Sequence, residues 1–197
     1  MKKRKQFSGK NVPPVEQVRE ELERERYRAR YKKTLKSTVF ALVSASAVAV
    51  LVATLWLPVL QIFGASMAPT LQEGEIVVSI KSKNLSPGDI VAFYYGNKVL
   101  VKRYIAGPGT WVDIREDGTV LLDDEILDEP YLNEKSIGIC DLELPYQVPE
   151  DTFFLMGDHR ETSVDSRHSS VGCIAEEQIV GKIVYRVWPL TGLGMVK

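Results

Sequence analysis

The chain has 197 residues, enough for one folded domain with an appendage. Its net charge of -1 combines two opposite parts: residues 1–36 carry 13 Lys/Arg and 5 Asp/Glu, a net charge of +8, and the remainder carries -9. A basic block alone would fit a nucleic-acid-binding arm, but this one runs into an apolar segment. We therefore expect a membrane protein that contacts the lipid bilayer and has no nucleic-acid partner.

Residues 14–36 have the composition of a charged helix, with Glu16, Glu20 and Glu23 at helical spacing. The surface of this helix is polar nearly all round and has too few apolar positions for a coiled coil. We interpret residues 1–37 as a basic, helical arm in the cytoplasm.

An apolar run without any charge extends over residues 39–60. As a helix it would span about 33 Å, close to the hydrocarbon thickness of a bilayer. Because the basic flank is N-terminal, the positive-inside rule predicts a transmembrane signal anchor at residues 38–61 and an extracytoplasmic domain at residues 62–197. A cleaved secretory signal is less consistent with the sequence, since both the basic and the apolar regions exceed the usual lengths.

The pattern of the part after the apolar run predicts short strands separated by turn signals, and no run in it has a sustained helical period. The expected strands lie at residues 75–80, 90–95, 99–105, 111–115, 119–122, 152–156 and 179–188. Gly96-Asn97 and Asp117-Gly118 are hairpin turn signals. The predicted fold class is all-β, a compact antiparallel β-sheet domain behind a single N-terminal transmembrane helix.

The two cysteines, Cys140 and Cys173, fall in the predicted outside domain. An oxidising compartment would permit a disulfide between them, but two cysteines are also common in a chain of this size. Two distant thiols lack the paired spacing of a metal site, so we expect no metal and no cofactor.

Ser66, six residues beyond the end of the apolar run, is the candidate nucleophile. A serine alcohol needs a base within hydrogen-bond reach. The chain has two histidines, His159 and His168, and a triad of Ser66, His159 and Asp165 is one hypothesis. Local spacing does not select it.

Lys102 is the alternative base. A lysine with an ordinary pKa is almost fully protonated at neutral pH, and burial among apolar groups lowers that pKa. Lys102 lies in an apolar stretch where period-two alternation places it on one face with Leu100 and Tyr104, while Arg103 points to the other face. From composition alone, the favoured interpretation is a lysine at a sheet rim with its stem along the apolar surface.

Four segments, in order behind the apolar run, resemble the motifs of bacterial type I signal peptidases. They are GASMAPTL at residues 64–71, PGDIV at 87–91, VKRYIAGPG at 101–109, and LMGDHR with SVDSR at 155–160 and 163–167. The resemblance extends from about residue 38 to the C-terminus and leaves the basic arm outside it. It implies a membrane-bound serine endopeptidase that cleaves signal peptides through a Ser/Lys dyad.

The resemblance also implies roles for individual residues. Ser66 would be the acyl-forming nucleophile and Lys102 the neutral general base. Ser163 would orient the amine of Lys102. The pairs Asp165–Arg167 and Asp158–Arg103 would brace the site. If these pairs lay on the surface, each would be worth roughly 0–1 kcal/mol.

Two positions depart from the family pattern. Some members carry a serine two residues before the nucleophile, whose hydroxyl completes the oxyanion hole; here that residue is Gly64. The Ser66 N–H would therefore act with the Gly64 N–H or a water molecule. His159 stands where an asparagine is common, which leaves the dyad intact and makes a pH effect near neutrality conceivable.

The family cleaves after small residues at the first and third positions before the bond, a pattern written Ala-X-Ala. Ile62 and Val101 match positions that line the corresponding shallow pockets, and Met67 is a further candidate for this wall. The implied partners are preproteins that carry signal peptides and emerge from the export machinery. The implied location is the plasma (cytoplasmic) membrane, with a single pass, the N-terminus inside and the catalytic domain outside.

Two other functions remain as alternatives. One is a serine/lysine self-cleaving regulator of similar core fold, but such regulators are soluble and linked to a DNA-binding domain. The other is a non-catalytic β-domain tethered outside the membrane as a binding module, which would need neither Ser66 nor Lys102.

Overall fold

The structure, a computed structural model, describes residues 14–82 and 84–196. It separates into two compact units, Met1–Val52 and Ala53–Lys197. The first thirteen residues of the predicted basic arm lie outside the described residues.

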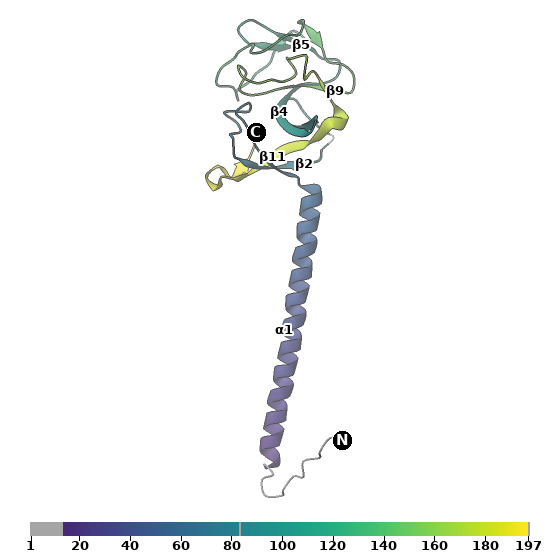
Figure 1. The fold of residues 1–197 in the computed structure, drawn as a ribbon, viewed down its shortest axis with the longest axis vertical. Coiled ribbons are helices and arrows are strands. Elements are labelled where there is room, and N and C mark those ends of the chain that lie inside the picture. Colours follow the sequence, from purple (N-terminus) through teal and green to yellow (C-terminus); the bar gives the residue numbers. More distant parts are fainter. Residues whose placement is uncertain (1–13, 83, 197) are drawn as a thin grey trace. The chain divides into compact units, whose positions relative to one another are not determined.

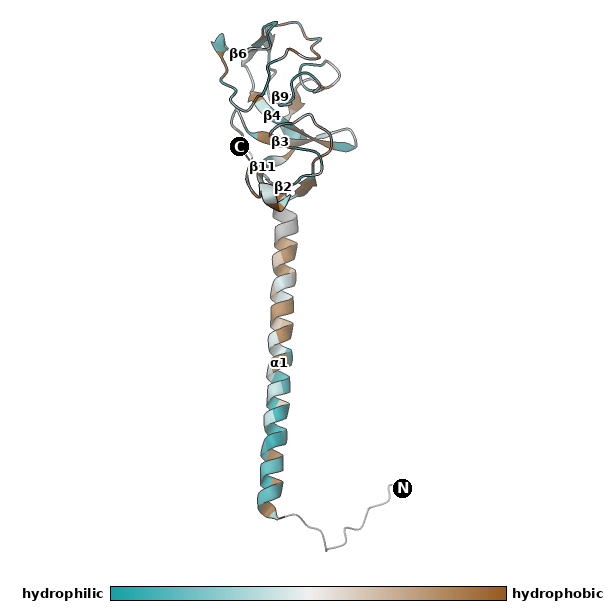
Figure 2. Ribbon diagram, turned by 90° about the vertical axis from the view of Figure 1, so that its left-hand side faces the viewer, coloured by the Kyte–Doolittle hydropathy of each residue, from teal (hydrophilic) through white to brown (hydrophobic). Residues whose placement is uncertain are grey.

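The described part of the first unit is helical. Helix α1 (Val15–Trp56) is continuous and changes from hydrophilic to hydrophobic along its length (Figure 2). By length and composition, it is the helix among the described residues that could cross a membrane. The apolar run was expected to stay helical as far as Leu60, which was wrong: α1 ends at Trp56, and Pro58 follows two residues later. The residue before a proline is biased away from the helical conformation, so the helix ends at this point.

The second unit contains a larger antiparallel sheet, with strands in the order β1-β2-β11-β3-β4-β9-β10 and with β12 paired to β11 (Figure 1). Its strands are β1 (Val59–Gln61), β2 (Ile76–Ile80), β3 (Ile90–Tyr95), β4 (Lys98–Ala106), β9 (Thr152–Met156), β10 (Ile174–Ala175), β11 (Ile179–Trp188) and β12 (Gly194–Met195). Two short 3-10 turns, η1 (Glu176–Gln178) and η2 (Leu190–Gly192), flank β11.

The partners of β4 change along its length. Residues from Lys98 to Arg103 pair with β3, and the second half, from Arg103 to Ala106, pairs with β9. One edge of the first half therefore has no strand partner among the described residues. Strand β1 likewise pairs with β2 alone, so its outer edge is also free within the same part of the chain.

A smaller antiparallel sheet has the order β7-β6-β5-β8. Its strands are β5 (Trp111–Ile114), β6 (Val120–Leu122), β7 (Glu125–Ile126) and β8 (Tyr146–Gln147). Gly118 turns the β5–β6 hairpin with φ of 82°, and a side chain at this position would collide with the backbone of Ser136.

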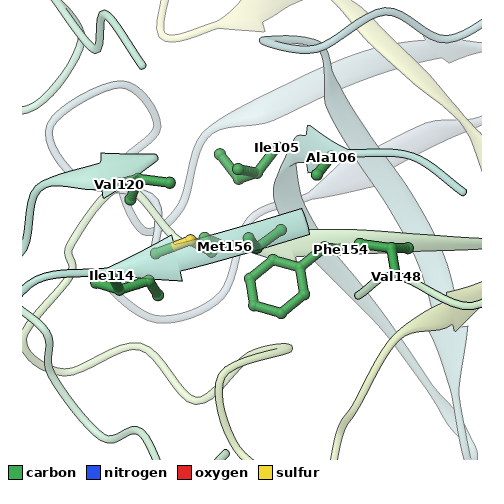
Figure 3. Close-up of a cluster of buried hydrophobic side chains, with 8 residues drawn as sticks. Ile105, Ala106, Ile114, Val120, Val148, Phe154 and Met156 are labelled. Carbon is green, nitrogen blue, oxygen red and sulfur yellow. The ribbon is translucent and has the colours of Figure 1, made fainter. Parts of the chain in front are cut away.

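A buried apolar cluster joins the two sheets (Figure 3). Ile105 and Ala106 of β4 and Phe154 and Met156 of β9 come from the larger sheet, and β5 and β6 supply the facing side chains. Those facing side chains are Val112, Ile114 and Val120. The cluster begins three residues after Lys102, so packing between the sheets holds the second half of β4 in place.

The predicted all-β class is confirmed. The expected strands at residues 90–95, 152–156 and 179–188 match β3, β9 and β11, and the other four differ by one residue at one or both ends. Strands β1, β7, β8, β10 and β12 were not expected. Each of them has two or three residues, too few to show an alternating pattern.

Phe154→Ala should lower the free energy of unfolding by about 3–5 kcal/mol, because the ring is fully buried between the sheets and its loss leaves a cavity. Phe154→Leu, which keeps most of the volume, should cost about 1.5 kcal/mol or less. Denaturant unfolding of the full chain in detergent measures both. Equal effects of the two substitutions would contradict tight packing at this position.

Candidate active site

A groove of about 660 Å³ opens between the two free strand edges of the larger sheet. One wall comprises residues 59–64, and the other comprises residues 98–102. Ser66, Met67 and Lys102 line the same groove, so two segments separated by more than thirty residues meet there.

Ser66 lies in a tight turn, residues 65–71, that follows β1. Within the turn, the Ala68 N–H donates to the Ala65 carbonyl at 3.0 Å and the Leu71 N–H donates to the Met67 carbonyl at 2.9 Å. Met67 and Leu71 are buried in an apolar cluster, which fixes one side of the turn. The Ser66 side chain is left at the groove surface.

The Lys102 side chain is buried, with 4% of the residue exposed. A lysine with an ordinary pKa would be charged at neutral pH, and burial disfavours that charge. Its Nζ donates to Ser163 Oγ at 2.9 Å. Burial lowers the pKa of Lys102 from 10.5 to about 8; Asp165 and Asp158 raise it, and Arg167 lowers it. The sheet-rim interpretation is therefore wrong for this lysine, because its amine is enclosed rather than solvated.

The predicted nucleophile and the predicted base line one groove but are not hydrogen-bonded. Among the described residues, the Ser66 hydroxyl has no hydrogen-bond partner, and the Lys102 amine is held by Ser163. Contacts between a nucleophile and its base are often long in unliganded enzymes and shorten in the substrate complex.

Asp165 and Arg167 form a fully buried pair behind Ser163. Arg167 donates from Nε and Nη2 to the two carboxylate oxygens, both at 2.9 Å, and the Gly157 N–H donates to Oδ2 at 2.9 Å. Burial alone would raise the pKa of Asp165, but Arg167, Gly157 and the Ser163 hydroxyl hold it below its usual value. Ser163 thus links the amine of Lys102 to this carboxylate.

Arg103 and Asp158 form a second buried pair, with side chains 2% and 0% exposed. Two parallel hydrogen bonds of 2.8 and 2.6 Å join them, and Arg103 Nη1 donates to the Gly88 carbonyl at 2.6 Å. The Thr70 hydroxyl donates to Asp158 Oδ2 at 2.5 Å. The value for surface pairs does not apply here, because both pairs are buried, and removing one member of a buried pair typically costs about 3–5 kcal/mol.

The two pairs explain why burial decides the pKa of Lys102. Each carboxylate near the amine has an arginine of its own, so neither Asp158 nor Asp165 offers an uncompensated negative charge. An unpaired aspartate would favour the ammonium form instead.

A third buried pair, between Arg160 and Glu129, was not predicted from the sequence. Arg160 Nη1 donates to Glu129 Oε2 at 3.2 Å, and a second bond joins Nη2 to Oε1. Tyr131 donates to Glu129 at 2.8 Å, and its ring centroid lies 3.8 Å from Cζ of Arg103. Glu129 and Tyr131 come from a stretch without strand pattern, and although Arg160 is the last residue of the motif at 155–160, no local signal gave it a partner.

The predicted pocket residues are brought together. Ile62 and Met67 are buried in one apolar cluster, Val101 packs against it, and all three line the groove. Gly64 also lines the groove and has φ of 78°. In the described part of the chain, the backbone N–H groups of Gly64 and Ser66 donate no hydrogen bond.

The histidines do not assemble the alternative triad. The His159 N–H donates to the Ser66 carbonyl at 3.0 Å, but its exposed ring is bonded to Thr162 through Nδ1 at 2.6 Å. His168 is bonded to Ser170, and no hydrogen bond joins either ring to Asp165 in the described residues.

Cys140 and Cys173 are both free thiols. No group of three or more His, Cys, Asp or Glu within residues 14–82 and 84–196 is arranged to hold a metal ion.

Comparison with known proteins identifies the family to which the chain belongs. Residues 35–188 match the family described as signal peptidase, peptidase S26. Signal peptidase IB of Staphylococcus aureus (strain COL) is 36% identical over 148 residues, which cover 65% of this chain and 76% of that protein. Signal peptidase I of Bacillus amyloliquefaciens is 34% identical over 164 residues, covering 77% of this chain and 84% of that protein.

A crystal structure of a signal peptidase I from Enterococcus faecalis V583 aligns at a TM-score of 0.42 and 26% identity, over 51% of this chain and 97% of that chain. The family match and the two relatives by sequence show that the chain belongs to the S26 signal peptidases. Together with the apolar helix, they indicate a membrane-anchored peptidase that cleaves signal peptides.

Lys102→Met should stabilise the folded protein more at pH 7 than at pH 10. Because the folded pKa is lowered, the penalty for burying the ammonium is fully present below pH 8 and disappears as the pH rises to 10.5. The difference between the two pKa values corresponds to roughly 3 kcal/mol. Unfolding of the wild type and the variant in detergent at both pH values measures it, with the exposed Lys135→Met as the control. A difference that does not change with pH would contradict a buried, titrating Lys102.

Proposed function

We propose that this chain is a membrane-bound serine endopeptidase that removes N-terminal signal peptides after small residues, with Ser66 as the nucleophile and Lys102 as the general base. The observation that carries the proposal is the buried amine of Lys102, held by Ser163 in the groove that Ser66 also lines. An amine with a pKa of about 8 is partly neutral near physiological pH and can accept a proton.

The proposed reaction uses this amine twice. Ser66 Oγ attacks the scissile carbonyl carbon while Lys102 Nζ takes the hydroxyl proton. The C–N bond then breaks as Lys102 returns the proton to the leaving amine, which leaves an acyl-enzyme. A water molecule enters, gives a proton to Lys102 and attacks the ester carbon. The C–O bond to Ser66 then breaks as Lys102 returns this proton to Ser66 Oγ, and the signal peptide departs with a new carboxyl group. Ser163 keeps the amine oriented through these steps, and the two buried Asp/Arg pairs keep its surroundings neutral.

The free N–H groups of Ser66 and Gly64 support an oxyanion hole at the start of the nucleophile turn. A donor aimed at the developing oxyanion is typically worth roughly 2.7–4 kcal/mol. With glycine at residue 64, no side-chain hydroxyl is available there, and the backbone supplies both donors.

The free edges of β1 and β4 support binding of an extended peptide, since an unpaired strand edge offers backbone donors and acceptors. Side chains of an extended peptide alternate, so the first and third residues before the bond face the same wall. Ile62, Met67 and Val101 are branched or bulky residues of that wall, and they would leave room for small side chains. This geometry supports the Ala-X-Ala specificity.

The sequence supports the orientation in which the basic arm is cytoplasmic and the catalytic unit is outside, in the plasma membrane. The substrates would then be preproteins that emerge from the export machinery with an apolar segment still in the bilayer. Membership of a peptidase family favours this function over a tethered binding module, and the apolar helix favours it over a soluble self-cleaving regulator.

Cleavage of a purified precursor with a small-x-small site tests the dyad. Ser66→Ala and Lys102→Ala should each lose at least about a thousandfold in rate, because neither nucleophile nor base has a substitute nearby. His159→Ala should stay within about threefold of the wild type, since its ring faces solvent. An active Lys102→Ala enzyme together with an inactive His159→Ala enzyme would replace the dyad with a histidine mechanism.

The pH profile gives an independent test. Below about pH 8, kcat/KM should rise about tenfold per pH unit as Lys102 loses its proton, and it should level off above that value. His159→Ala should show the same profile. An inflection near pH 6.5 that disappears in His159→Ala would instead identify a histidine base.

A further inference from the structure

Within the described residues, two backbone carbonyls of the turn that carries Ser66 accept hydrogen bonds from other elements. The Ser66 carbonyl accepts from the His159 N–H at 3.0 Å. The Thr70 carbonyl, four residues further on, accepts from Arg186 Nη2 at 2.8 Å. Arg186 lies on β11, outside all four segments that resemble the signal peptidase motifs.

Arg186 divides its donors between this turn and a buried carboxylate. Its Nη1 donates to Glu75 Oε1 at 2.8 Å, and the side chains of Arg186 and Glu75 are 22% and 7% exposed. An arginine that only neutralised Glu75 could form two parallel bonds with it. Here the described residues offer no partner to Arg186 Nε or Glu75 Oε2, and the second donor is directed to Thr70.

Glu75 connects this arrangement to the groove. Its backbone carbonyl accepts from the Ile62 N–H at 2.8 Å, and the neighbouring Gly74 N–H donates to the Ile62 carbonyl at 2.9 Å. The Glu75–Arg186 bridge is defined as the ion pair between these two side chains and the hydrogen bond from Arg186 to Thr70. Together with the backbone of Glu75, it spans from the groove wall to the nucleophile turn.

Thr70 extends the connection to the strand that carries Lys102. Its hydroxyl donates to Asp158 at 2.5 Å and accepts from Arg103 Nη2 at 3.3 Å. Arg103 is the residue after Lys102. Thr70 is thus the point where contacts from β4, from β11 and from the loop that contains Asp158 meet.

We propose that Arg186, held by Glu75, is a positioning residue that sets the distance between Ser66 and Lys102 by holding Thr70. This inference rests on the proposed Ser66/Lys102 function. Without Arg186, the Thr70 carbonyl loses its partner, and the second half of the turn is held by the Thr70 hydroxyl and the buried Leu71 side chain alone, so that the backbone at Ser66 can shift by a small distance. A displacement of about 1 Å at a reacting group can cost on the order of a hundredfold in rate.

The test compares the double variant Glu75→Gln/Arg186→Met with the wild type in precursor cleavage. The double variant removes both charges, so no buried carboxylate is left unpaired. We expect kcat to fall about ten- to a hundredfold, KM to stay within about twofold, the pH of half-maximal kcat/KM to stay unchanged, and the thermal midpoint to stay close to that of the wild type. Arg186→Lys, which keeps the charge, should regain part of kcat.

The matched control is Lys182→Met. Lys182 is another cation on β11, paired with Asp89 at 2.6 Å, and neither residue contacts the nucleophile turn. Its kcat should stay within about twofold of the wild type. If Glu75→Gln/Arg186→Met were too unstable to assay, the kcat of Arg186→Lys relative to Lys182→Met would decide.

Three results would overturn the proposal. A wild-type kcat in the double variant, or a wild-type kcat in Arg186→Lys where that variant decides, would mean that Arg186 does not position Ser66. A raised KM with unchanged kcat would mean that the bridge shapes the groove for substrate. A shifted pH profile would mean that it acts on the proton affinity of Lys102. Ser66→Ala in the same assay distinguishes failure of this inference from failure of the proposed function. If Ser66→Ala is inactive, a negative result concerns Arg186 alone. If it is active, the proposed function fails and this inference fails with it.

Discussion

The amine of Lys102 has lost nearly all its water, and the carboxylates around it are occupied by arginines. Removal from water favours the neutral amine, whereas an unpaired carboxylate nearby would favour the ammonium ion. The site satisfies both requirements by burying Asp165 with Arg167 and Asp158 with Arg103. Burying four such charges is costly unless their hydrogen bonds are met, and here backbone groups such as the Gly157 N–H and the Gly88 carbonyl meet several of them.

Strand β4 connects this electrostatic arrangement to the packing of the fold. Its first half forms a groove wall, Lys102 and Arg103 lie at its centre, and Ile105 and Ala106 enter the cluster between the two sheets. Because β9 pairs only with the second half, the strand is anchored on one side of the lysine and keeps a free edge on the other. The base is thereby rigid and the groove next to it stays open to an extended chain.

The last motif supports the site from the opposite side. A side chain at Gly157 would collide with Ser163 Oγ and with the Ser66 carbonyl, so a glycine lets this segment lie directly against the nucleophile turn. Nucleophile, base and orienting serine come from three segments that are separated along the chain. Their contacts run through buried charges and backbone groups rather than through a flexible loop, as expected of a preorganised site.

The sequence by itself determined the features that depend on local pattern. Alternating β-branched and aromatic residues predicted β3, β9 and β11, and alternation in residues 99–105 placed Lys102 on a face with Leu100 and Tyr104. An uncharged run next to a basic block predicted the apolar part of α1. These properties follow from nearest-neighbour sterics and from the periods of helix and strand, which a linear sequence records.

The tertiary structure alone decided which charges are buried together. Glu129 meets Arg160 across 31 residues, and Arg186 reaches Thr70 across 116, with no local signal for either contact. The pairing of Asp158 and Asp165 with their arginines was implied by the family resemblance, but nothing in the local sequence showed that the pairs are buried. The pKa of Lys102 belongs to this second group, because desolvation depends on which distant segments pack around a group and not on its neighbours in the chain.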